Sequence, residues 1–420
     1  MELKKYKLGE IADFNKENIG STDKFTVIEY LDTSSITENV ISGISFLNIS
    51  DAPSRAQRKV TNNTIIYSTV RPRLKHYGIL FSPKNNLIVS TGFVTIDVKD
   101  IFKDKIDARY LFLLLTQANI TEYIGNIADT AVSAYPSINP TDISSIYFNF
   151  PDIQIQKIIS DIWFNYDSKI ELNRAINQNL EAMAKQLYDY WFVQFDFPDE
   201  NGRPYKSSGG KMIWDEKLKK MIPIDWHCGN LFEIAVFTNG LACQKFRPKD
   251  GEIPLPVIKI REMHDGISAD TEEVTSNIPE SVKVYNGDVL FSWSASLEVM
   301  LWAYGLGGLN QHIFKVTSAN DFPKSFYYFQ LLDYVDVFKK MAEARKTTMG
   351  HITQDHLQQS TIAIPNNKDI ADRFEELVSP IFNQIIKLQE EIINLTKQRN
   401  ELLPLLMNGQ VSVNSDLSDD

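Results

Sequence analysis

The sequence contains few of the residues from which disulfide frameworks, zinc sites and membrane spans are built. Only two of its 420 residues are cysteines, Cys228 and Cys243, and they form no Cys-x-x-Cys pair. This scarcity argues against a disulfide framework and against a structural zinc site. No apolar run approaches the roughly 18 residues of a membrane span, and the first ten residues lack the apolar stretch of a signal peptide. We therefore expect a cytoplasmic protein.

Acidic residues are missing from one long stretch of a chain that is acidic as a whole. The formal net charge of −11 at pH 7 disfavours nucleic acid as a partner, because Lys and Arg supply most of the sequence-independent affinity for phosphate. Between Asp51 and Asp97, however, there is no acidic residue. Because the local field decides what a surface attracts, this interval is a candidate DNA-binding surface. A merely solvated basic loop is the alternative. The candidate DNA-binding residues of the interval lie on both sides of a predicted strand: Arg55, Arg58, Lys59, Arg71, Arg73, Lys75 and His76.

Sequence motifs for catalysis are also lacking. A DNA methyltransferase needs an Asn/Asp-Pro-Pro-Tyr/Phe motif and a glycine-rich loop that opens a helix and holds S-adenosylmethionine, and neither occurs. Residues 139–142 are interpreted as a turn that opens a short element, and 305–308 as a turn beside a strand. Asp199 and residues 215–217 resemble the carboxylate and lysine spacing of a nuclease, but they lie in a polar connector. We expect no catalytic residue, no metal and no cofactor.

The chain repeats one pattern at an interval of about 214 residues. Repeats of about 20–50 residues build solenoids, so an interval this long indicates duplicated domains. The openings of the two copies, residues 7–11 and 230–234, also match each other. The repeated pattern runs through Ile138, Ile143, Phe148, Phe150 and Pro151 in the first copy and Ile352, Leu357, Ile362, Ile364 and Pro365 in the second.

Both copies combine strand and helix patterns. In the first globule, residues 1–150, short apolar runs at 64–67 and 93–96 predict strands and residues 108–124 predict a helix. In the second globule, residues 224–365, the corresponding strands are predicted at 289–291 and 313–316 and the helix at 326–341. The predicted fold class is therefore mixed α/β, with two tandem globules.

A long helical pattern follows each globule, over residues 151–195 and 366–411. Its apolar residues recur at intervals of three and four along one face, which predicts that the two helices pair as an antiparallel coiled coil of roughly 50 Å. The alternative is that each helix is buried only against its own globule. Lys169, Asn173 and Arg399 interrupt the apolar face, either to fix the register or to mark a docking site. Pro380 predicts a kink or a restart.

The remaining segments have the composition of connecting and terminal chain. Residues 196–223 are rich in Pro, Gly and Ser and are predicted to form a linker. Residues 412–420 are acidic and polar and are predicted to be a disordered tail. The layout is thus globule, long helix, linker, globule, long helix and tail, which suits a protein that grips a partner with two separated parts.

Four phrases occur in order on this duplicated layout: GGKMIW at 209–214, IPIDW at 222–226, LNQHIFKV at 309–316 and ELLPLLMNGQV at 401–411. Together they resemble the DNA-specificity subunit of type I restriction–modification systems, and the likeness covers essentially the whole chain. The resemblance implies a non-catalytic subunit whose two target recognition domains each read one half of a bipartite double-stranded DNA site. It also implies that the long helices set the spacer and dock two methyltransferase (modification) subunits, to which restriction subunits are added.

The second globule offers a different set of candidate DNA contacts. Residues 292–296 are small, polar and aromatic where the first globule has its basic turn, and residues 310–313 correspond to 90–93. The two globules are therefore not expected to read the same bases. Arg and amide side chains read base edges, whereas Lys more often meets phosphate. That Gln311 and His312 simply hydrogen-bond inside the globule is the alternative. The candidates are Lys245, Arg247, Trp293, Ser294, Gln311 and His312.

Two functions of other classes stay open from the sequence. A combined methylase–nuclease enzyme would need a cofactor pocket and would methylate DNA without a partner. A coiled-coil scaffold that binds only proteins would show no sequence-dependent retention on DNA.

Overall fold

The computed structural model describes residues 3–130, 135–294, 296–344, 352 and 354–410. It divides into two compact units, of which the first comprises Met1–Asp167 with Arg399–Asp420 and the second Ser168–Gln398. The predicted tail, residues 412–420, lies outside the described residues. Within the described part, no helix is long and apolar enough to cross a membrane.

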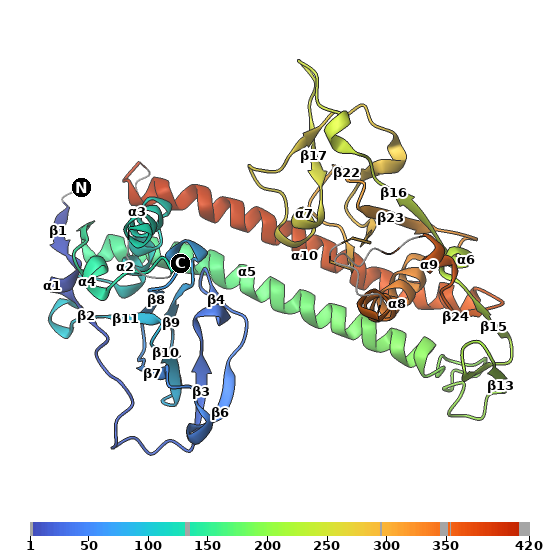
Figure 1. Cartoon of the computed structure of the whole chain (residues 1–420), viewed down its shortest axis with the longest axis horizontal. Coiled ribbons are helices and arrows are strands. Elements are labelled where there is room, and N and C mark those ends of the chain that lie inside the picture. Colours follow the sequence, from blue (N-terminus) through green and yellow to red (C-terminus); the bar gives the residue numbers. More distant parts are fainter. Residues whose placement is uncertain (1–2, 131–134, 295, 345–351, 353, 411–420) are drawn as a thin grey trace, which may run out of the picture. The chain divides into compact units, whose positions relative to one another are not determined.

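The first unit contains two four-stranded sheets (Figure 1). One has the order β2-β11-β8-β9 and is antiparallel throughout. The other has the order β6-β3-β10-β7, and its central strands β3 and β10 are parallel. Strands β1 and β12 pair separately, as do β4 and β5. The strands are β1 (Lys4–Lys7), β2 (Ala12–Phe14), β3 (Val27–Leu31), β4 (Ile36–Thr37), β5 (Val40–Ile41), β6 (Ser45–Asn48), β7 (Ala56–Lys59), β8 (Thr64–Ser68), β9 (Tyr77–Leu80), β10 (Leu87–Ser90), β11 (Phe93–Val98) and β12 (Tyr147–Phe150). The helices are α1 (Leu8–Ile11), α2 (Ala108–Leu115), α3 (Ala118–Asp129) and α4 (Pro140–Ser144).

The second unit contains the same two kinds of sheet, in the orders β16-β23-β20-β21 and β18-β17-β22-β19. Strands β17 and β22 are its parallel pair. Strands β13 and β14 form a hairpin, and β15 pairs with β24. The strands are β13 (Met212–Asp215), β14 (Lys220–Pro223), β15 (Trp226–Gly229), β16 (Ala235–Asn239), β17 (Leu255–Ile258), β18 (Glu273–Val274), β19 (Lys283–Val284), β20 (Val289–Ser292), β21 (Glu298–Leu301), β22 (Gly307–Leu309), β23 (Ile313–Ser318) and β24 (Ile362–Pro365). The helices are α6 (Leu231–Ile234), α7 (Ile260–Asp265), α8 (Lys324–Ala344) and α9 (Gln354–Gln358).

The duplication predicted from the sequence is confirmed strand by strand. In chain order, the nine strands β2, β3 and β6–β12 correspond to β16–β24, and both sets assemble in the same spatial order with the same parallel pair. The matching openings fold alike, because α1 and α6 are each four residues long and each runs directly into the first strand of the fully antiparallel sheet, β2 or β16. The prediction of two mixed α/β globules is also confirmed.

The helix predicted at residues 108–124 is instead two helices, α2 and α3. The Thr116 hydroxyl donates to the Phe112 carbonyl at 2.9 Å, and Gln117 takes an extended conformation with ψ 145°. A hydroxyl that bonds back to the preceding turn competes with helix propagation. The apolar spacing continues across this break, which is why periodicity alone predicted one helix.

The two long helices are α5 (Ile153–Tyr188), which continues into a π-helical turn at Asp189–Val193, and α10 (Asp369–Met407). Contacts between them occur inside each unit. In the first unit, Leu406 of α10 packs in the same buried cluster as Ile159 of α5. In the second unit, the Lys169 ammonium lies 2.6 Å from the Glu391 carboxylate. Helix α10 passes through Pro380 without a restart.

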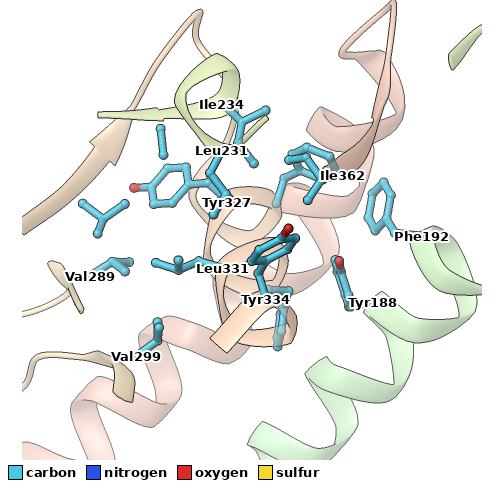
Figure 2. Close-up of a cluster of buried hydrophobic side chains, with 14 of the residues drawn as sticks. Tyr188, Phe192, Leu231, Ile234, Val289, Val299, Tyr327, Leu331, Tyr334 and Ile362 are labelled. Carbon is cyan, nitrogen blue, oxygen red and sulfur yellow. The ribbon is translucent and has the colours of Figure 1, made fainter. Parts of the chain in front are cut away.

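Aromatic rings from several elements form the core of the second unit. Tyr188 of α5, Tyr327 and Tyr334 of α8, and Phe192 of the π-helical turn converge on this core with apolar residues of the sheet (Figure 2). The Phe192 and Phe374 rings meet edge to face with centroids 5.0 Å apart. Burying one such side chain contributes about 1.5–3 kcal/mol, so within this unit the long helices are part of the domain core.

Carboxylates in residues 196–223, the predicted linker, are used in turns. Asp199 accepts backbone N–H bonds from Asn201 and Arg203, both at 2.8 Å, and the bond from Arg203 is the main cause that lowers the pKa of Asp199. Asp215 accepts the backbone N–H bonds of Lys217 and Leu218 at the β13–β14 turn. Among the described residues, no group of three or more His, Cys, Asp or Glu side chains could hold a metal ion.

Candidate DNA interface

The predicted DNA contacts of the two globules share one topologically equivalent loop, which follows β8 in the first domain and β20 in the second and holds Arg71 and Trp293 respectively. In each domain this loop is bonded to the loop after β10 or β22, one strand of the parallel pair, through the N–H of Thr69 or Trp293. Such loops tolerate sequence change and carry binding residues on a rigid scaffold. We call them the first and second loop clusters.

The first loop cluster consists of Arg55, residues 69–71, residues 91–92 and Tyr135. Backbone bonds tie it together: the N–H of Thr91 donates to Arg55 O at 2.8 Å, and that of Thr69 donates to Gly92 O at 2.9 Å. The N–H of Arg71 donates to Pro136 O at 2.9 Å, next to Tyr135. Segments up to 80 residues apart in the sequence thus form one connected surface.

Two exposed guanidinium groups dominate the first loop cluster. Arg55 leaves 61% of its side chain exposed and has Asp32 as a loose partner at 3.9 Å. Arg71 has a left-handed backbone, with φ 48°, and its guanidinium lies 4.9 Å from the centre of the Tyr135 ring. Stacking on an aromatic face orients a guanidinium without neutralising its charge. Arg55 and Arg71 are therefore brought together as charged donors.

The other five candidates of this interval contact the protein itself. The Arg58 guanidinium donates to Asn18 at 3.0 Å, and burial lowers its pKa. Lys59 lies 2.9 Å from Asp23, whose hydrogen bond raises the Lys59 pKa. Arg73 lies 2.9 Å from Asp129 on α3. Lys75 pairs with Glu38, and His76 Nδ1 lies 2.7 Å from Ile36 O.

The second loop cluster consists of residues 241–247, 259–261, 293–294 and 310–312. The N–H of Leu241 donates to Leu309 O, and that of Gln311 donates to Leu241 O, both at 2.8 Å. The His312 ring is exposed and lies 5.6 Å from the Trp293 ring, and Trp293 Nε1 donates to Asn239 at 3.2 Å. This arrangement presents an imidazole and an indole side by side.

Burial and ion pairing differ among the remaining candidates of the second loop cluster. Lys245 ends the 3₁₀ turn Cys243–Lys245 and is exposed, whereas Ser294 is buried. Arg247 lies 3.6 Å from Glu272. Gln311 is partly exposed, with its Nε2 3.4 Å from His312 Nε2.

A cleft in the second loop cluster includes residues that sequence reasoning missed. Gln244, Lys259 and Arg261 line it together with Gln311 and His312. Lys259 lies 2.5 Å from Glu272 and lowers the pKa of that carboxyl through a hydrogen bond. Arg261 pairs with the buried Glu262 at 2.7 Å. The sequence contains a signal that could have identified Lys259 and Arg261 as candidates, because both lie within three residues after the apolar strand β17.

A close backbone approach beside the second loop cluster requires glycine. A Cβ at Gly240 would lie 2.2 Å from the backbone oxygen of Asn310, whereas one at Gly43 would meet nothing within 4 Å. We expect Gly240→Ala to lower the free energy of unfolding by about 1–3 kcal/mol, as overpacking does. Gly43→Ala, the control, should stay within about 0.5 kcal/mol. Urea titrations of both variants would measure this, and equal stabilities would contradict the close approach.

Comparison with known proteins identifies the family. The sequence profile of the type I restriction modification DNA specificity domain matches residues 1–182 and 223–396, one match per copy of the repeat. The chain belongs to this family. Both predictions, of a DNA-specificity subunit and of a chain that leaves catalysis to other subunits, are confirmed by this match and by the relatives below.

Relatives of the specificity family match along nearly their whole length. The chain is 24% identical to the specificity subunit of the type I restriction enzyme HindI from Haemophilus influenzae, over 98% of this chain and 100% of that protein. It is also 24% identical to the MjaIX specificity subunit from Methanocaldococcus jannaschii, over 98% and 94%. The solved type I restriction-modification S subunit from M. genitalium is 14% identical, with 96% of each chain covered and a TM-score of 0.59, so the fold is shared.

Proposed function

We propose that this specificity subunit recognises a bipartite DNA site, with one half read by each loop cluster. The observation that carries the proposal is the duplicated topology, which repeats one strand order and gives both domains an equivalent loop with candidate contacts, after β8 (Arg71) and after β20 (Trp293). A pair of like domains with unlike loop chemistry is suited to two different half-sites. Dimeric DNA-binding proteins likewise translate their domain spacing into half-site spacing.

In this proposal the half-site contacts differ between the domains. Arg55 and Arg71 would donate to base edges or phosphates. Arg58, Lys59, Arg73, Lys75 and His76, which already contact other groups of the protein, would contribute less. In the second domain, Gln311, His312 and Trp293 would meet bases, and Lys245 and Arg247 would meet phosphates. Gln244, Lys259 and Arg261 join this set because they line the same cleft.

The long helices α5 and α10 would pair as an antiparallel coiled coil that sets the spacer. In the second unit, three contacts run in opposite directions along the two helices: Lys169 with Glu391, Asn177 with Ile385, and Tyr188 with Phe374. In the first unit, Asp167 pairs with Arg399. A rod whose length is fixed by helical rise is a suitable ruler.

The partners in this proposal are double-stranded DNA, two methyltransferase subunits docked on the helices, and restriction subunits. Exposed apolar side chains on both long helices support docking there, since Leu172 is 60% exposed and Leu377 is 50% exposed. Partner subunits that add phosphate contacts would also explain how a chain with a net charge of −11 binds DNA.

The proposal is tested by co-expressing this chain with the methyltransferase encoded beside it and mapping methylated bases across a genome. We expect one gapped motif, with two defined half-sites and a spacer of fixed length. An ungapped motif would overturn the two-reader assignment. Methylation by this chain alone would overturn the assignment of catalysis to other subunits.

A further inference from the structure

Asn39, Asp167 and Arg399 form a partly buried polar junction inside the first unit. Asp167, on α5, is 8% exposed. It accepts a hydrogen bond from the Asn39 side-chain amide at 3.3 Å and pairs with Arg399 of α10. The Arg399 guanidinium also lies 5.0 Å from the centre of the Trp163 ring. We call these three residues the Asp167 junction, and it joins the first recognition domain to both long helices.

Asn39 is held rigidly on the domain side of the junction. It occupies the two-residue turn between β4 and β5, where Glu38 has φ 47° and Asn39 has φ 70°, as tight hairpin turns require. Its N–H donates to Tyr77 O at 2.9 Å, and its Oδ1 accepts the N–H of Ile79 at 3.0 Å. Asn39 thereby caps the outer edge of β9, so the sheet fixes the position of its side-chain amide.

A separate attachment fixes the same domain near the start of α5. The fully buried Gln156 donates to Lys105 O at 2.8 Å and accepts the N–H of Asp107 at 3.0 Å. Arg109 of α2 lies 2.6 Å from Asp161. Eleven residues separate positions 156 and 167, which is about 16 Å along the helix. Two attachments this far apart oppose rocking of the domain about either one.

We infer that Asn39 is a positioning residue that restricts spacer length by bonding the first recognition domain to Asp167. The inference rests on the proposed function, because it presupposes a spacer set by the helices. Sites that differ by one base pair in spacer place a half-site about 3.4 Å farther along the duplex and about 35° around it. Without the Asn39 bond, the attachments that remain along α5 end at Phe164, whose ring lies 5.3 Å from that of Phe81. The domain would then rock enough to accept both neighbouring spacers.

The sequence provides a matched control for Asn39 within the same domain. Asn15 also has a left-handed backbone, with φ 54°. Its N–H donates to Thr95 O at 2.9 Å, and its Oδ1 accepts the N–H of Thr95 at 3.1 Å. Asn15 and Asn39 therefore make the same kind of contacts to a strand. Asn39 differs from Asn15 by its additional bond to Asp167. Glycine tolerates both backbone conformations.

The test measures methylation by the co-expressed complex on duplexes whose spacer is the wild-type length or one base pair longer or shorter. In Asn39→Gly we expect the rate at the altered spacers, relative to the wild-type spacer, to rise about tenfold. In Asn15→Gly we expect this ratio to stay at the wild-type value. Asn39→Asp keeps the Oδ1 acceptor and adds repulsion against Asp167, so it should raise the ratio at least as much, whereas Asn15→Asp should not.

The outcomes separate a positioning role from a merely stabilising one. An unchanged ratio in both Asn39 variants, or an equal rise in the Asn15 variants, would overturn the inference whatever the melting temperatures. If the wild-type complex itself accepted all three spacers equally, the proposed function would fail first. Unchanged base preference in both half-sites is expected throughout, because the junction contacts neither loop cluster.

Discussion

Replacing both exposed guanidinium groups of the first loop cluster, in Arg55→Ala/Arg71→Ala, is expected to lower affinity for cognate DNA about 100-fold. Removing one arginine that contacts DNA costs about 1–3 kcal/mol, and every 1.4 kcal/mol is a tenfold change in affinity. The slope of log affinity against log salt concentration should also become shallower by about two phosphate contacts, because two cations are lost. Titrations of the assembled complex at several salt concentrations would measure both effects.

A control variant and a variant of the second loop cluster show which half-site is read by which domain. Lys103→Ala removes a cation that is 66% exposed and pairs with Asp100 on the same unit, and it should leave affinity nearly unchanged. Gln311→Ala/His312→Ala should relax base preference in the other half-site only. Equal loss at both half-sites from the Arg55/Arg71 variant would contradict the two-reader proposal.

Much of the fold could be predicted because apolar residues, which become buried, recur periodically in the sequence. Residues 64–67 and 289–291 were predicted as strands, and β8 and β20 are the buried central strands they form. The turn predicted at residues 139–142 is the start of α4, where the N–H of Asn139 donates to Asp142 at 2.7 Å. Local hydrogen-bonding chemistry of this kind is readable from neighbouring residues.

What could not be predicted depends on contacts between distant residues. Lys59 is neutralised by Asp23, 36 positions away, so the absence of acid between Asp51 and Asp97 overstated the free charge of that interval. Arg71 is exposed, and its guanidinium lies over the ring of Tyr135, which lies beyond the same interval. Sequence composition shows which charged residues are present, but tertiary pairing decides which of them stay free of a carboxylate partner and could contact DNA.

Arg399 shows the same limit within the long helices. As an interruption of an apolar face, it fitted either register fixation or docking of another protein. In the first unit its side chain is only 17% exposed, and its guanidinium contacts Asp167 and Trp163, which favours a role inside the chain. Desolvated ion pairs contribute little net stability but strongly penalise misalignment, so Arg399 is suited to fixing where α10 meets α5.

Lengthening α5 and α10, the helix pair proposed as the ruler, is expected to lengthen the spacer between the two half-sites. One heptad inserted into α5 between Asn173 and Asn177, together with one into α10 between Ile385 and Glu391, would keep the apolar faces aligned, because a heptad closes two turns. Seven residues add about 10.5 Å, or roughly three base pairs. Three base pairs also turn the duplex by about 100°, so we expect a preferred spacer one to three base pairs longer, at a reduced rate.

The half-sites distinguish a ruler from a reader in this experiment. Methylated-base mapping should return both half-sites unchanged, with the wild-type spacer methylated at least about tenfold more slowly, a difference of roughly 1.4 kcal/mol. A heptad inserted into α10 alone would leave seven residues without facing partners, and it should lower the melting temperature without giving a new spacer. New half-sites at the old spacer would mean that α5 and α10 contact bases and do not set the distance, because a change of length alone cannot alter the groups that the loop clusters present.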